Sequence, residues 1–209
     1  PGAPAEARRY LINPWGLNYE EVTASNLVKV DTAGAIVGEA SHGVNPAGFV
    51  IHGAIHAARA DAHCVIHTHT TTGMAVACKA GGLRHDNFYS AQLAGRVAYH
   101  EFEGVAVHDD ERPRLVASLG DRDILILRNH GLLVVGAEVA TAYWLLWTLQ
   151  RACDVQALAD SMLGPNAEIA AGVAQRCAED AVRFDPQIGA LWFHGALRRH
   201  RIRYADLVE

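Results

Sequence analysis

Three histidines in two short segments have the spacing of a metal site. His67 and His69 stand two residues apart in HCVIHTHT, at the end of an apolar stretch. In a β-strand, residues i and i+2 point to the same face, so two imidazoles at this spacing can bind one divalent ion. His130 follows a second apolar stretch, DILILRN, and therefore has the same setting. Three histidines with an open position form a common plan for a catalytic metal centre, and imidazole suits zinc first.

A structural role is the alternative interpretation of these histidines. A bare HxH pair also occurs on surface strands, and His130 could be an ordinary turn residue, because a motif of this size has many chance matches. Two features favour a metal. An unpaired imidazole at the end of an apolar strand would be costly, and a second part of the chain repeats the arrangement.

Composition and charge indicate an ordinary globular protein. Of the 209 residues, 50% are hydrophobic and 20% are charged, and the formal net charge is −5. This length suits a single domain over 1–209 with a substantial core. The negative charge argues against a nucleic-acid partner, and no apolar run approaches the roughly 18 residues that suggest a membrane span.

The cysteines and the first residues suggest where the protein is found. The four cysteines match no disulfide framework, which is typical of reduced thiols in a cytoplasmic protein. Residues 1–10 lack the apolar stretch of a signal peptide and run straight into a predicted strand. We therefore expect an N-terminal segment of the natural chain to lie upstream.

The apolar periodicity predicts strands mixed with helices in a layered α/β or α+β domain. A helical turn is predicted over 21–27 and a hairpin over 26–38, and the strand over 63–69 is expected at the centre of a sheet. The predicted strands are 9–13, 26–31, 63–69, 96–102, 123–129 and 131–136. The predicted helices are 47–60, 71–80, 109–120, 138–162, 166–183 and 186–200.

Several of these segments together resemble the class II aldolase/adducin family, in its adducin-like bacterial branch. The resemblance rests on HTHT, on RNHGLLVVG some sixty residues later, and on NPWGLNYEEVTASNLVKVD, NPAGF and AYHEFEG. It implies a three-layer α/β/α sandwich with a central, mostly antiparallel sheet. It also implies a homotetramer with sites at subunit interfaces, and His67, His69 and His130 as the metal ligands.

One departure from the family bears on the chemistry. The sugar-phosphate aldolases carry Ser-Ser-Glu upstream of the HxH pair, and Gly48, in NPAGF, occupies the place of the acid. A glycine can neither accept a proton nor bind a metal through a side chain. The segment also lacks the serine hydroxyls that grip phosphate, which argues against a phosphorylated sugar as substrate.

Other residues are candidates for the acid–base and substrate-binding roles. His52 lies one helical turn beyond Gly48, and a neutral imidazole there could act as a base, with helix packing as the alternative. Tyr89 lies near the place of the family's catalytic tyrosine, with a packed aromatic as the alternative. Thr70 and Thr71 could meet a substrate anion at a helix N-terminus, with plain capping as the alternative. Gly48 is expected to line the same substrate pocket.

Together these features predict a metal-dependent lyase. A divalent ion, zinc first and manganese or another ion second, would polarise an oxygen of a small, unphosphorylated hydroxy or keto acid. Retro-aldol cleavage or decarboxylation would then leave an enolate that the ion stabilises. The alternative is a non-catalytic, adducin-like binding or scaffold module that keeps the fold and the metal site.

Overall fold

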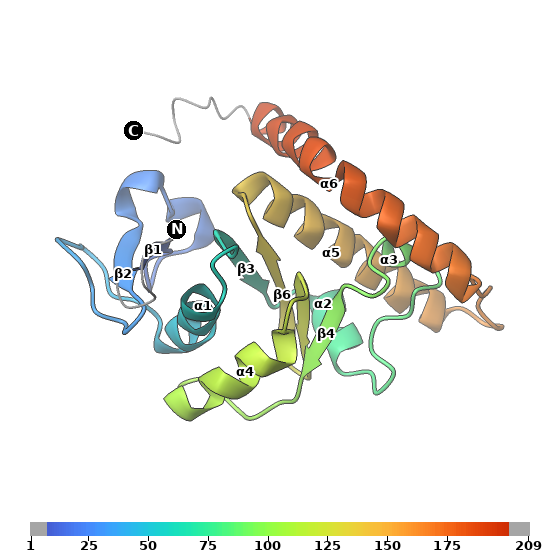
Figure 1. Ribbon diagram of the computed structural model, residues 1–209, viewed down its shortest axis with the longest axis horizontal. Helices are drawn as coiled ribbons and strands as arrows, with labels where there is room; N and C mark the ends of the chain where they lie inside the picture. The colour runs from blue at the N-terminus through green and yellow to red at the C-terminus, as the bar shows by residue number, and fades with distance from the viewer. Residues whose placement is uncertain (1–7, 201–209) are drawn as a thin grey trace. The chain divides into compact units, whose positions relative to one another are not determined.

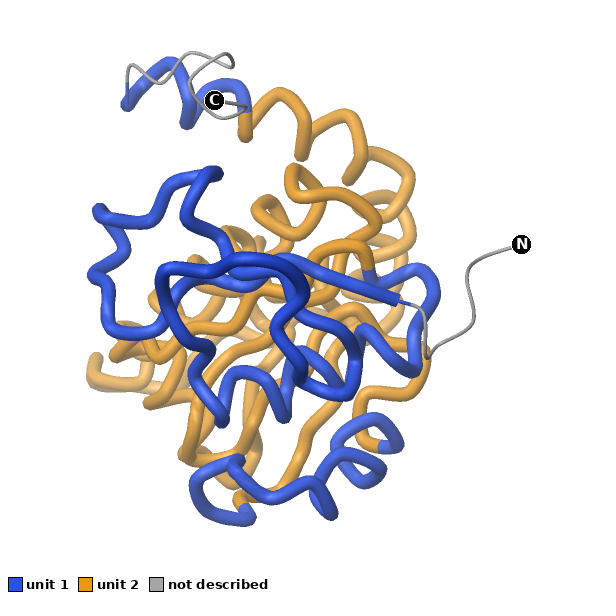
Figure 2. The backbone as a smooth tube through the Cα atoms, turned by 90° about the vertical axis from the view of Figure 1, so that its left-hand side faces the viewer, with its two compact units in different colours: residues 1–62, 103–117, 194–209 blue, residues 63–102, 118–193 orange. Residues whose placement is uncertain are grey.

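The chain separates into two compact units in a computed structural model that describes residues 8–200. Figure 2 colours the first unit, residues 1–62, 103–117 and 194–209, blue, and the second unit, residues 63–102 and 118–193, orange. The single domain expected from the length of the chain stays a prediction. Figure 1 labels most of the helices and strands.

The first unit contains a small two-stranded sheet. β1 (Arg9–Ile12) pairs antiparallel with β2 (Val28–Asp31), and the buried side chains of these two strands form a small core of their own. Two 3-10 turns, η2 (Tyr19–Glu21) and η3 (Ala24–Asn26), lead into β2. They stand where the sequence predicted a short helical turn.

The hairpin predicted over 26–38 is present in reduced form. A single bridge joins Val30 and Ile36, and β2 takes β1 as its ladder partner instead. The carboxylate of Asp31 accepts hydrogen bonds of 2.9 Å from two backbone N–H groups just beyond it. This local bonding turns the chain at the end of β2, so the segment after the turn adds no full strand.

Helical structure in the first unit begins with α1 (Pro46–Ala58). The side chain of Asn45 accepts a hydrogen bond of 3.1 Å from the backbone N–H of Ala47, and proline at the first helical position favours the start. Farther along the chain, η4 (Asp109–Glu111) leads into α4 (Arg112–Leu119). Both helices were predicted from their sequence periodicity.

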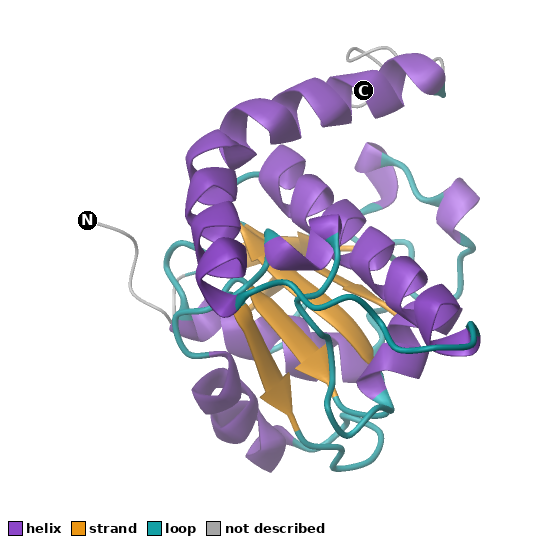
Figure 3. Cartoon of the chain, turned by 90° about the vertical axis from the view of Figure 1, so that its right-hand side faces the viewer, coloured by secondary structure: helices purple, strands orange, loops and turns teal. Residues whose placement is uncertain are grey.

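The second unit contains a four-stranded sheet in the order β3 (Cys64–Thr68), β6 (Gly131–Gly136), β5 (Ile124–Leu127) and β4 (Val97–His100). The β3–β6 and β5–β6 pairs are antiparallel, and the β4–β5 pair is parallel. The sheet is therefore mostly antiparallel, as predicted, and Figure 3 shows its strands in orange.

The prediction that β3 is a central strand is wrong. β3 is an edge strand of this sheet, and all five of its residues are partly exposed, whereas every residue of β5 and β6 is buried. The apolar runs of β5 and β6 are continuous, which is typical of strands covered on both faces. β5 and β6 form a tight hairpin and occupy the centre of the four-stranded sheet.

Helices cover one face of this sheet (Figure 3). Alternate residues of the strands, among them Ile124, Ile126, Leu132 and Val134, pack with residues of the helices in one apolar core. The remaining alternate residues, including His67 and its strand partner Leu133, point to the opposite face. The helices that contribute to this core are α2 (Thr71–Ala77), α3 (Phe88–Ala91) and α5 (Val139–Ser161), and α6 (Ala171–Arg199) contacts α5.

The two last helices predicted from the sequence are one helix, α6, which runs through Pro186. A proline inside a helix removes a hydrogen bond and costs about 3 kcal/mol. The buried carboxylate next to it offsets this cost, because Asp185 accepts hydrogen bonds from Trp144 Nε1 at 2.9 Å and Arg96 Nη1 at 2.6 Å. Within residues 8–200, no helix is both long and apolar enough to cross a bilayer.

Candidate metal centre

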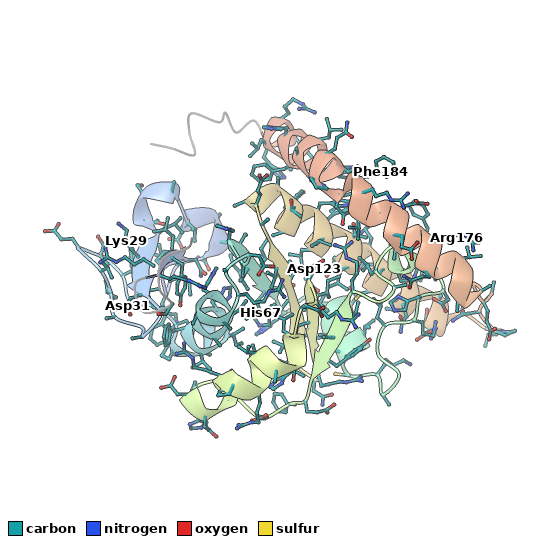
Figure 4. All side chains as sticks on the ribbon, in the orientation of Figure 1. Lys29, Asp31, His67, Asp123, Arg176 and Phe184 are labelled. Carbon is teal, nitrogen blue, oxygen red and sulfur yellow. The ribbon has the colours of Figure 1, made fainter. Side chains whose placement is uncertain are left out.

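Three histidine side chains converge in the second unit. One ligand nitrogen from each of His67, His69 and His130 lies within 4.8 Å of the others. The ring centroids are separated by 4.6 Å, 4.9 Å and 4.8 Å. His69 is exposed, whereas the other two are partly buried, and Figure 4 labels His67 among the side chains. These are the three residues that the sequence analysis predicted as ligands of one metal ion.

Strand pairing explains why residues so distant in sequence meet. β3 and β6 run antiparallel, so the end of β3 lies beside the start of β6, with Thr68 opposite Leu132. β5 and β6 form a hairpin in which Leu127 pairs with Gly131, and the connection between them is only three residues long, 128–130. His130 therefore sits at the same end of the sheet as the HxH pair.

The ring of His67 is oriented by the backbone of the neighbouring strand. His67 Nδ1 donates a hydrogen bond of 2.9 Å to the carbonyl of Leu132, so in the neutral ring Nε2 is the nitrogen that carries the lone pair a metal ion would use. His67 Nε2 and His69 Nε2 are 2.8 Å apart. Two nitrogen ligands of tetrahedral zinc are about 3.3 Å apart, so a small outward movement of one ring would fit this ion.

Gly131 follows His130 in a place with no room for a side chain. A Cβ atom there would lie 2.4 Å from the backbone oxygen of Thr68 and 3.0 Å from His69 Cδ2. This glycine is therefore required by the close approach of β3 and β6 rather than by a turn conformation. The residue that does adopt a positive φ, 54°, is Asn129 in the hairpin connection.

The electrostatic setting keeps His130 neutral. Burial lowers the pKa of its imidazole below the ordinary value, and the nearby His69 and His100 lower it further. A metal ligand must be unprotonated, so this shift favours ion binding near neutral pH. The donor set fits a cation, since it consists of three imidazoles and one of them is already oriented by a backbone carbonyl.

Thr70 and Thr71 lie directly after the HxH pair. Thr70 occupies the N-cap position of α2, but its hydroxyl donates a hydrogen bond of 2.5 Å to Gln150 Oε1 and makes no side-chain cap. Thr71 is exposed in the first turn of the helix. Their proposed contact with a substrate anion stays a prediction.

Sequence reasoning missed a polar network beside these threonines. Gln150 Nε2 donates hydrogen bonds of 2.7 Å to Thr72 Oγ1 and to Asp154 Oδ1, and the Thr72 hydroxyl donates to the same carboxylate. The network fastens α2, which follows the metal ligands, to α5. Its signal in the sequence was a glutamine and an aspartate four residues apart in a largely apolar helix.

Tyr89 lies in the second unit within an aromatic group. Its ring packs edge-on against Trp147 with 5.6 Å between centroids, and it contacts the apolar core of the unit. The contacts that Tyr89 makes within this chain are therefore packing contacts, which was the alternative interpretation of this residue. Its catalytic role stays a prediction.

Gly48 and His52 lie on α1 in the first unit, whereas the three metal-site histidines belong to the second. A Cβ atom at Gly48 would meet nothing closer than 3.7 Å, so a side chain could be accommodated there. Burial, and secondarily His56, lowers the pKa of His52 to about 4, although part of its surface is exposed. His52 is therefore neutral at pH 7. The roles of both residues stay predictions.

Comparison with known proteins identifies the family. The family described as Class II Aldolase and Adducin N-terminal domain matches residues 3–157, and the chain belongs to it. The α-adducin of Rattus norvegicus is 45% identical over 155 residues, which cover 73% of this chain but 21% of α-adducin. The chain spans 59% or less of the length of several other curated relatives.

Two solved structures resemble the chain in both sequence and fold. The crystal structure of an aldolase II superfamily protein from Pseudomonas syringae is 44% identical with a TM-score of 0.85, covering 95% of this chain and 79% of that one. The L-fuculose 1-phosphate aldolase of Glaciozyma antarctica PI12 is 27% identical with a TM-score of 0.77, covering 93% and 78%. The predicted α/β fold class is therefore confirmed.

Proposed function

We propose that this protein is a metal-dependent lyase that cleaves a C–C bond of a small, unphosphorylated hydroxy or keto acid. The observation that carries the proposal is the convergence of His67, His69 and His130 within 4.8 Å. Membership of the class II aldolase family and the likeness to a fuculose 1-phosphate aldolase support the lyase class. Zinc is the proposed ion, because three imidazoles are a donor set that it favours.

The three histidines would hold the ion and leave a position open for substrate. A divalent ion bound there would supply Lewis-acid polarisation of a substrate oxygen and stabilise the negative charge that C–C cleavage develops. The hydrogen bond from His67 Nδ1 to Leu132 fixes one ring in its ligating orientation. Gly131 allows the two strands that carry the ligands to approach each other.

The proposed substrate class follows from the absence of carboxylate and hydroxyl groups at the start of α1. Gly48 has no carboxylate, and the neighbouring residues Pro46 and Ala47 offer no hydroxyl that could grip a phosphate. This composition favours an acid without a phosphate group. His52 and Tyr89 are the proposed acid–base residues. Because the pKa of His52 is about 4, it would serve at neutral pH mainly as a hydrogen-bond partner of the substrate.

The assembly and the cellular location belong to the same proposal. We place the protein in the cytoplasm because its cysteines match no disulfide framework. We propose a homotetramer with its sites at subunit interfaces, which is what the family resemblance implies. Exposed apolar side chains on α6, such as Phe184 and Leu191, are consistent with further packing partners.

A substrate panel tests the catalytic proposal. Purified protein loaded with zinc or manganese is incubated with small hydroxy and keto acids, and release of pyruvate or carbon dioxide is followed with and without chelator. We expect turnover of at least one acid that chelator abolishes and that His67→Ala lacks. Absence of metal-dependent turnover across the panel would contradict the proposed lyase activity.

The second candidate is a non-catalytic module. The specific observation in its favour is that α-adducin is 45% identical over the matched region, together with Gly48 in place of the family's acid. If the ion only stabilises the fold, small acids should leave the spectrum of the cobalt-loaded protein unchanged. A spectral change on adding an acid would instead indicate an open coordination position.

A further inference from the structure

The third metal ligand lies on a connection that must be held in place. His130 is the last of the three residues, 128–130, that join β5 to β6, and connecting segments are usually more mobile than the strands they join. Metal affinity depends on the partners that orient the ligands as well as on the ligands themselves. The contacts of the other two residues of this connection therefore bear on the site.

Arg128 makes three contacts with two surrounding segments, β4 and the end of α2. Its backbone N–H donates a hydrogen bond of 2.8 Å to the carbonyl of His100, at the end of β4. Its Nη1 donates a hydrogen bond of 2.7 Å to the carbonyl of Lys79, just beyond α2. Its guanidinium lies 4.2 Å over the ring of Tyr99. The Arg128 side chain is 19% exposed, although its hydrogen bond to the Lys79 carbonyl lies at the surface.

The remaining contacts connect the same loop to α2. The backbone N–H of Asn129 donates a hydrogen bond of 3.2 Å to the carbonyl of Ala77, the last residue of α2. The first residue of α2 comes two positions after His69. The start of α2 therefore follows the HxH pair, and the end of α2 binds the connection that carries His130.

Each partner of Arg128 is itself fixed. The Tyr99 hydroxyl accepts a hydrogen bond of 3.0 Å from the backbone N–H of Leu83, and the tyrosine ring packs against the apolar core. Glu101 contributes little, because its carboxylate is 3.9 Å from Arg128 Nε and 85% exposed. The anchoring of Arg128 therefore depends on a carbonyl and an aromatic face rather than on an ion pair.

We propose that Arg128 is a positioning residue that holds His130 in its ligating place by fastening the β5–β6 connection to the end of α2. The inference rests on the proposed metal centre. An arginine is needed because its planar guanidinium can stack on Tyr99 while it donates to the Lys79 carbonyl. A lysine could reach the carbonyl but would lose the stacked contact, so it should restore the function only in part.

Cobalt binding tests this role. Co²⁺ is titrated into wild-type protein and into the Arg128→Met, Arg128→Lys and Arg84→Met variants, and visible absorption reports both affinity and coordination geometry. Arg84 is the matched control, because its side chain also fastens a loop of the second unit, to Asp86 and Asp160. Circular dichroism and urea unfolding without metal show whether each variant is folded.

We expect Arg128→Met to weaken Co²⁺ binding about 10- to 100-fold and to reduce the intensity of its visible bands. Arg128→Lys should fall between this variant and wild type, and Arg84→Met should bind as wild type does. Wild-type affinity and spectrum in a folded Arg128→Met variant would overturn the inference while leaving the metal centre intact. If wild-type protein binds no Co²⁺, the proposed metal centre itself is wrong, and the inference falls with it.

Discussion

At the scale of single residues, the proposed metal centre requires the absence of a side chain at Gly131 as well as its three histidine ligands. The Cβ of an alanine at position 131 would lie 2.4 Å from the Thr68 carbonyl oxygen, a backbone atom that cannot move aside without shifting β3. We expect Gly131→Ala to cost about 1–3 kcal/mol of folding free energy and to weaken metal binding at least about tenfold. Urea unfolding and metal titration measure the two effects.

Gly81→Ala is the control for this prediction. Gly81 belongs to the same unit, has no atom within 4 Å of an added Cβ, and has no positive φ. The substitution should leave metal binding unchanged. Equal metal affinity in the two alanine variants would show that the space at Gly131 does not matter to the site.

His52 makes a second prediction at this scale. Its pKa is about 4 in the folded chain against an ordinary value of 6.5, so the unfolded chain binds more protons between these values. The stability that His52 contributes is therefore complete above about pH 6.5 and is lost as the pH falls toward 4. The loss should be about 1–3 kcal/mol.

Urea unfolding of metal-free protein at pH 7.5 and pH 5 measures this effect. His52→Gln should make the difference in stability between the two pH values smaller than in wild type. The exposed His63, replaced in the same way, serves as the control and should leave that difference unchanged. An identical pH dependence for His52→Gln and wild type would contradict the lowered pKa of His52.

At the scale of elements, α6 is held by one buried carboxylate. Asp185 lies between Arg96 and Trp144, and both the aspartate and the arginine are largely buried. Asp185→Ala would remove the acceptor of the buried Trp144 Nε1–H group and would leave Arg96 with Asp123 as its remaining acidic partner, so we expect it to cost about 1–3 kcal/mol. Asp180→Ala on the same helix, where the carboxylate is 64% exposed, should cost well under about 1 kcal/mol. Similar urea midpoints for the two variants would refute the buried contact.

The limits of sequence reasoning are clearest at this same scale. Periodicity predicted nearly every helix and strand, because it reports which residues of a segment share a face. It placed β3 at the centre of the sheet, since strand order depends on pairings between distant segments. It also divided α6 at Pro186, because it had no means of predicting that Asp185 would be buried against α5 and stabilise the helix there.

The candidate site was likewise predictable from the sequence only in part. The setting of His67, His69 and His130 at the ends of apolar strands made a shared site one of two interpretations, and the resemblance to the class II aldolase/adducin family favoured it. The hydrogen bond that orients His67 was not predictable, because its acceptor is the backbone carbonyl of Leu132, and the side-chain type of that residue carries no signal. The functions of His52 and Tyr89 remain predictions.

At the scale of the whole molecule, ion binding should stabilise the fold. A ligand that binds only the folded chain, at a free concentration 100 times its Kd, contributes about 2.7 kcal/mol. For a chain of this size, that corresponds to a rise in Tm of about 5–10 °C. Chelator should lower the Tm of wild type by this amount and leave the Tm of His67→Ala unchanged. An equal response of the two proteins to chelator would contradict binding at the three histidines.

The most direct test of the central claim is the number of ions bound per chain. Wild type and His67→Ala are exposed to zinc, dialysed against metal-free buffer, and assayed by elemental analysis. We predict one zinc ion per wild-type chain and well below one in the variant. A metal-free wild-type protein, or a variant that retains a full equivalent of zinc, would contradict the account.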